Sequence, residues 1–147
     1  MKQEVHFRYN QLVQDKIDAC RDFISSLTTD AQNDAKGSAG DKHETALSMM
    51  HLEQEKYNFK LREFYAQKAI LNQINPNEKS SKVVLGSLVQ VNQLWVYIST
   101  ALPKISLANE TVFAVSPQSP LGTQLVNKTV GHQFDLQGTS YTILRVE

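Results

Sequence analysis

The sequence lacks several features that would indicate a particular class of protein. Its single cysteine, Cys20, excludes an internal disulfide. Fifteen Lys and Arg residues balance fifteen Asp and Glu residues. Non-specific binding to nucleic acid or to acidic membranes requires a basic excess, so this balance argues against both. The chain also lacks the run of about eighteen apolar residues that a membrane-spanning helix needs, and its first six residues lack the apolar core of a signal peptide. We expect a cytoplasmic protein.

Proline is absent from residues 1–74, so nothing there interrupts a helix. Apolar residues in this stretch recur at alternating steps of three and four, which is the heptad pattern of a coiled coil. The first seam comprises Val13, Ile17, Cys20, Ile24, Leu27 and Ala31. The second seam comprises Leu47, Met50, Gln54, Tyr57, Leu61, Phe64, Lys68 and Leu71, where Gln54 and Lys68 are polar interruptions.

Residues 36–40, Lys-Gly-Ser-Ala-Gly, separate the two seams and can end a helix. A linker this short favours antiparallel neighbours. Folding the arms back about this turn pairs Cys20 with Leu61 and Ile24 with Tyr57, and most other layers are also apolar on both sides. The layer of Leu27 against Gln54 is the weakest. The sequence therefore predicts an antiparallel helical hairpin over residues 1–75, with its tip at residues 37–44.

The pattern changes after a polar linker at residues 76–81, which Pro76 opens. Short β-branched and aromatic runs bounded by turn residues predict strands at 83–85, 88–91, 94–98, 111–115, 133–136 and 141–146. Ser119 and Pro120 have the residue types of an N-cap and a first helical position, and predict a short helix through Val126. The expected fold is α+β: a coiled-coil hairpin followed by a small antiparallel β domain over residues 82–147.

Asp41 and Glu44 are the most informative polar residues, because they lie where the hairpin must turn. Carboxylates three residues apart at the start of a helix share one face and favour the positive end of the helix dipole. One reading is structural, with Asp41 as the cap of the second helix and Glu44 at the third position of a capping box. The other reading is functional, because Mg²⁺ prefers oxygen ligands and keeps several waters when only two carboxylates are available.

Two stretches resemble the bacterial Gre transcript-cleavage factors. The first is Gly40-Asp41-Lys42-His43-Glu44, which is similar to the Gre tip. The second runs from Val115 to Gly131 and is similar to the Gre C-terminal signature, in which Ser-Pro opens a short helix. Hairpin, linker and sheet also follow one another in the order of that family.

The resemblance implies a coiled-coil finger joined to an FKBP-like domain that docks on RNA polymerase, with Ser119, Pro120 and Leu121 as partner-binding residues. It also implies that the finger enters the secondary channel. There, Asp41 and Glu44 would act in trans as catalytic carboxylates and share a Mg²⁺ ion with the polymerase. On this reading the protein is not itself an enzyme, holds no tightly bound cofactor, touches transcript RNA only indirectly and binds neither DNA nor membranes.

The sequence is also compatible with two alternative functions. A Gre-fold regulator could occupy the same channel and inhibit or modulate transcription without cleavage. A coiled-coil interaction module unrelated to transcription would not bind polymerase, and would self-associate through its seam or an open sheet edge.

Overall fold

The computed structural model describes the backbone of residues 1–37 and 40–147, and the side chains there except those of residue 31 and residues 34–43. The described chain forms two compact units. Residues Gln11–Lys68 form one, called here the hairpin unit. Met1–Asn10 and Ala69–Glu147 together form the other, the sheet unit. Two long helices, a mostly antiparallel sheet and one short helix confirm the predicted α+β class.

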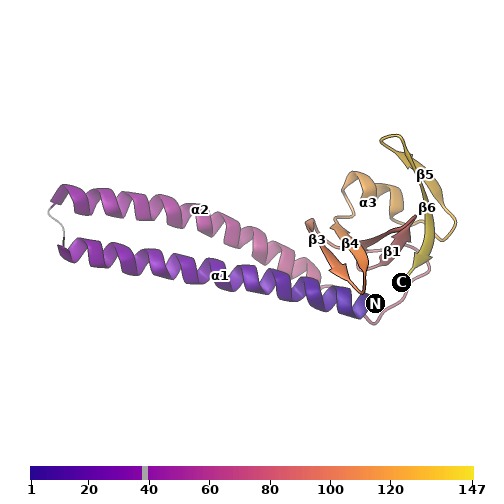
Figure 1. Ribbon diagram of the computed structural model, residues 1–147, viewed down its shortest axis with the longest axis horizontal. Helices are drawn as coiled ribbons and strands as arrows, with labels where there is room; N and C mark the ends of the chain where they lie inside the picture. The colour runs from indigo at the N-terminus through magenta and orange to yellow at the C-terminus, as the bar shows by residue number, and fades with distance from the viewer. Residues whose placement is uncertain (38–39) are drawn as a thin grey trace. The chain divides into compact units, whose positions relative to one another are not determined.

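The hairpin unit consists of parts of two long helices that lie side by side (Figure 1). These are α1 (Lys2–Gly37) and α2 (Gly40–Asn72). The Cys20 thiol donates a hydrogen bond to the Tyr57 carbonyl oxygen over 3.2 Å. The Phe23 and Tyr57 rings meet at 4.3 Å between centroids, one position from the predicted layer of Ile24 and Tyr57. The seam therefore predicted which parts of the two arms meet.

The polar interruption at Gln54 is satisfied across the hairpin. Its side-chain amide donates to the Thr28 hydroxyl oxygen over 2.8 Å, and that hydroxyl donates to the Ile24 carbonyl oxygen over 3.3 Å. Because a half-buried amide without a partner costs free energy, this bond favours one alignment of the two arms. The layer that looked weakest in the sequence is thus a polar contact between the arms.

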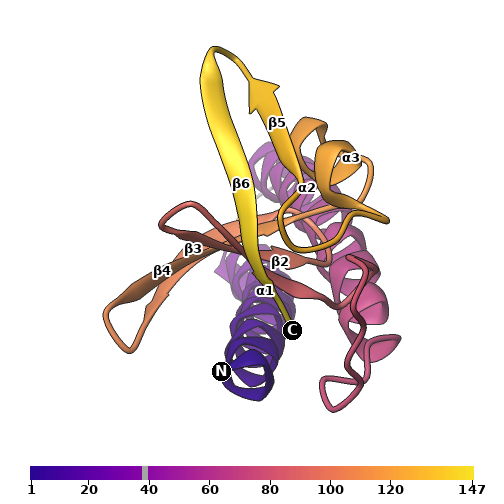
Figure 2. The same ribbon diagram turned by 90° about the vertical axis from the view of Figure 1, so that its right-hand side faces the viewer.

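The sheet unit contains six strands in the order β3-β4-β2-β1-β6-β5, with the short helix α3 (Pro120–Leu125) beside them (Figure 2). All strand pairs are antiparallel except β2 with β4, which is parallel. The strands are β1 (Leu88–Val91), β2 (Leu94–Ile98), β3 (Leu102–Leu107), β4 (Glu110–Val115), β5 (Gln133–Leu136) and β6 (Thr139–Val146).

One face of this sheet packs against α3. Leu125, which is fully buried, anchors the helix in an apolar cluster with side chains from β1, β2, β5 and β6. Alternate strand residues contribute to this cluster, as the two-residue period of a strand requires. Its buried members are Val83, Val89, Val91, Val96, Ile98, Leu125, Phe134 and Ile143.

Within the same unit, the first turns of α1 pack against the other alternating set of strand side chains. Tyr9 is fully buried, and its ring stacks on that of Tyr97 with 6.1 Å between centroids. Its hydroxyl group lies 3.0 Å from the Pro103 carbonyl oxygen and 3.2 Å from that of Val112, and donates to them. His6 Nδ1 lies 2.7 Å from the Tyr97 hydroxyl oxygen. These contacts join the beginning of the chain to β2, β3 and β4.

Three sequence-based expectations about the strands are wrong. Residues 83–85 form no strand, because Val83 pairs with residues 127 and 128 of the loop after α3 and the chain then turns at Gly86, where φ is +92°. Strand β3 was not predicted, because Pro103 and Lys104 interrupt its apolar residues. The sheet is not wholly antiparallel, since β4 pairs in parallel with β2 while β3 forms the neighbouring edge.

Two buried phenols make the sheet unit sensitive to alkaline pH. Burial raises the pKa of Tyr9 and of Tyr97 well above the ordinary value of 10. Above pH 10 the unfolded chain therefore loses phenolic protons that the folded protein keeps, so the free energy of unfolding falls as the pH rises. Burial of Lys2 lowers the pKa of its ammonium group, which has the opposite effect up to about pH 10.5.

We predict that stability declines above about pH 10, because two phenols outweigh one ammonium group. The Tyr97→Phe variant should lose stability less steeply than the parent there, by about 1.4 kcal/mol per pH unit. Chemical denaturation at a series of alkaline pH values measures both slopes. Parallel pH profiles for the parent and the variant would contradict this origin of the decline.

Candidate functional site

The end of the hairpin at which α2 begins contains the predicted acidic pair. Because α2 begins at Gly40, Asp41 and Glu44 belong to its first two turns. The Glu44 side chain is exposed, whereas that of Asp41 lies outside the described residues. A carboxylate this close to a helix N-terminus is stabilised by the helix dipole. Glu44 is therefore a solvent-facing acceptor that could bind a cation in cooperation with a partner.

A pair of carboxylates here could supply only part of a metal site. Mg²⁺ bound through one or two carboxylates keeps waters or takes further oxygen ligands from elsewhere. Among the described residues, no group of three or more His, Cys, Asp or Glu side chains could hold a metal ion. Two carboxylates alone would therefore leave coordination positions open to water or to ligands from another molecule. The alternative capping role of Asp41 also falls on a side chain outside the described part.

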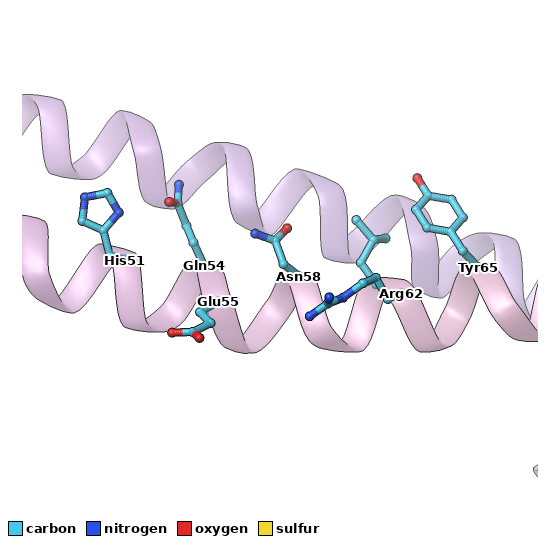
Figure 3. Close-up of a pocket in the computed structure, with 7 residues that line it drawn as sticks. His51, Gln54, Glu55, Asn58, Arg62 and Tyr65 are labelled. Carbon is cyan, nitrogen blue, oxygen red and sulfur yellow. The ribbon is translucent and has the colours of Figure 1, made fainter.

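A shallow groove of about 570 Å³ follows one side of α2 within the hairpin unit (Figure 3). Its residues are not among those predicted to form a site. The lining residues recur at steps of three and four, so they form one stripe of the helix surface. The stripe combines one acidic and one basic side chain with hydrogen-bonding and apolar groups, so the groove is of mixed polarity. Its residues are His51, Gln54, Glu55, Asn58, Leu61, Arg62 and Tyr65.

The predicted partner-binding residues begin α3 in the sheet unit. Ser119 is the N-cap: its hydroxyl oxygen accepts a hydrogen bond from the Gly122 amide over 2.9 Å, and its hydroxyl donates to the Ser116 carbonyl oxygen over 2.7 Å. Leu121 packs against the apolar cluster, whereas Pro120 is exposed. Ser119 and Leu121 thus have roles within the fold. Pro120 is the member of the three that is most available to a partner.

The turn before α3 is so tightly packed that it restricts which residues can occupy it. A Cβ atom on Gly122 would lie 2.1 Å from the Ser116 carbonyl oxygen, a distance that no side chain can occupy. The serine cap, the proline at the first helical position and this glycine together fix the start of α3. The Ser-Pro-Leu-Gly stretch that contributed to the Gre resemblance therefore has a structural role in this chain as well.

The sequence matches no protein-family model and no curated protein. Within the described residues, none of the helices carries an apolar stretch long enough to traverse a bilayer.

Proposed function

We propose that this protein is an RNA-polymerase-binding elongation factor of the Gre type. Its hairpin enters the secondary channel of the polymerase, and Asp41 and Glu44 promote cleavage of backtracked transcripts. The polymerase performs the chemistry, and the carboxylates help to hold a second Mg²⁺ ion at its active site. The protein acts in the cytoplasm, contacts RNA only through the polymerase complex and needs no tightly bound cofactor of its own.

The observation that supports this proposal best is the exposed Glu44 at the start of an uninterrupted helix. The 33 residues of α2 give it a length of about 50 Å. A second observation is the order of elements, in which a hairpin precedes a sheet with a short Ser-Pro helix. Two-metal cleavage of a phosphodiester needs a second cation a few ångströms from the first, and carboxylates are suited to retain it.

The test is transcript cleavage by backtracked elongation complexes of the cognate polymerase in the presence of Mg²⁺. We expect the parent protein to release short 3′ RNA fragments, and a variant with both Asp41→Ala and Glu44→Ala to lose this stimulation by on the order of 100-fold. Polymerase binding should remain, because the substitutions remove only charge at the tip. The matched control replaces Asp15 and Asp18, two exposed carboxylates of α1, by alanine.

The outcomes of this assay distinguish the three functions considered. Unchanged cleavage by the tip variant would overturn the role of the carboxylates. Binding without cleavage, or slower elongation, would favour a regulator that occupies the same channel. Absence of binding to polymerase would favour an interaction module unrelated to transcription.

A further inference from the structure

The surface of α2 opposite the hairpin seam has an apolar line of its own. Met49, Leu52 and Phe59 are large apolar side chains that are 62%, 66% and 58% exposed. They follow steps of three and seven, so with Lys56, Glu63 and Ala66 they form a second heptad line. This line, called here the outer line, faces away from the seam because each residue advances about 100° around a helix.

Charged residues border the outer line on both sides. Glu53 and Lys60, which are seven residues apart, lie along one border of the outer line. Glu55 and Arg62, also seven apart, follow the other and project from the same side of α2 (Figure 3). Each border therefore carries one acidic and one basic residue. In a coiled coil, residues at such border positions determine which partner and which orientation are favoured.

We propose that the outer line binds the outer line of a second copy of this chain in antiparallel orientation. In an antiparallel pair of helices, each border faces the same border of the partner helix. Glu53 then meets Lys60 of the second copy, and Glu55 meets Arg62 of the second copy. The two-fold symmetry repeats both contacts, which gives four opposite-charge pairs in one interface.

The same alignment also brings the residues of the two outer lines into packing contact. Phe59 packs against the aliphatic stem of Lys56 of the second copy, as long cationic side chains do on apolar surfaces. Met49 meets Ala66 of the second copy, and Leu52 meets the stem of Glu63. One register thus gives opposite-charge pairs along both borders and packing contacts along the centre of the interface.

A parallel arrangement of two copies is disfavoured by like charges. It would place Lys56 against Lys56 and Glu63 against Glu63 at the centre of the interface, where repulsion is costly. An unrelated apolar partner would leave the alternating border charges without a reason for their spacing. The charges therefore identify a second copy as the occupant. This inference does not depend on binding to RNA polymerase.

Sedimentation equilibrium of the full chain, from micromolar to submillimolar concentrations, tests the interface. We expect a reversible dimer in the parent and at least about tenfold weaker association in the Leu52→Glu variant, since the new carboxylate would face the like-charged Glu63 of the second copy. Val130→Glu is the control, because Val130 is 58% exposed in the sheet unit. A parent that stays monomeric throughout, or a dimer weakened only by Val130→Glu, would overturn the proposal. Thermal unfolding by circular dichroism establishes that each variant is folded.

A charge-exchange experiment tests the orientation. Glu53→Lys alone and Lys60→Glu alone each create like-charge pairs, and we expect each to weaken self-association by about tenfold. In a mixture of the two variants, however, every such pair again has opposite charges, so a heterodimer should form with parent-like affinity. The Glu53→Lys, Lys60→Glu double variant should also dimerise by itself. Failure of both the mixture and the double variant to associate would overturn the antiparallel register.

Discussion

A Gly122→Ala variant is expected to lose at least about 3 kcal/mol of the free energy of unfolding of the sheet unit. The added methyl group would lie 2.1 Å from the Ser116 carbonyl oxygen, 2.9 Å from the Ser119 hydroxyl oxygen and 3.0 Å from the Pro117 carbonyl carbon. Two of these neighbours are backbone atoms, so relief requires the turn before α3 to move. That movement would also break the cap that Ser119 provides and disturb the burial of Leu125.

Denaturant unfolding of the two proteins measures this loss. Gly138→Ala is the matched control, because Gly138 has a φ of +80° but no atom within 4 Å of the position of an added Cβ atom. It should cost only the conformational penalty of a left-handed residue, about 1 kcal/mol. Equal losses for the two variants would show that crowding at Gly122 is not the dominant effect.

The second large effect is expected at Tyr9. Replacement by alanine should lower the free energy of unfolding by about 3–5 kcal/mol, because a fully buried aromatic ring is deleted from the packing between α1 and the sheet. The loss also removes the stacking partner of Tyr97 and the hydroxyl group that donates to the carbonyl oxygens of Pro103 and Val112. Calorimetry or denaturant unfolding gives the magnitude.

Two further variants divide this effect into its parts. Tyr9→Phe keeps the ring and removes only the hydroxyl group, so about 1–2 kcal/mol should be lost. Phe7→Ala is the control on the same helix, since Phe7 is 69% exposed and its removal should change stability by less than about 0.5 kcal/mol. A Phe7→Ala variant as unstable as Tyr9→Ala would contradict the assignment of Tyr9 to the core.

Much of this fold was predictable because its strongest signals are local. The steps of three and four identified the hairpin and its pairing, since the helical period is encoded in adjacent turns. Ser119 and Pro120 predicted α3 because a cap and a first-turn proline act within four residues. The position of Glu44 near the start of α2 followed from the same reasoning. The role of Asp41 and Glu44, and the division into residues 1–75, 76–81 and 82–147, stay predictions.

The features that the sequence did not reveal depend on distant segments. Strand β3 contains Pro103 and the exposed Lys104, which reduce its apparent strand propensity but suit an edge strand. Tyr9 precedes the predicted seam, and its contacts are with strands about a hundred residues later in the chain. The outer line could not be predicted, because the sequence does not show whether an apolar residue on a helix is covered by another segment or exposed to solvent.

The membership of residues 1–10 in the sheet unit has a consequence for the order in which the protein matures on the ribosome. The hairpin unit interrupts the sheet unit in the chain, so the sheet unit depends on segments synthesised at very different times. Tyr9 emerges early but cannot meet Val112 until 103 further residues have been synthesised. Closing so long a loop is slow, whereas the contacts of the hairpin unit are more local. We therefore expect nascent chains to form the hairpin first and to keep Tyr9 accessible to chaperones until β4 has left the exit tunnel.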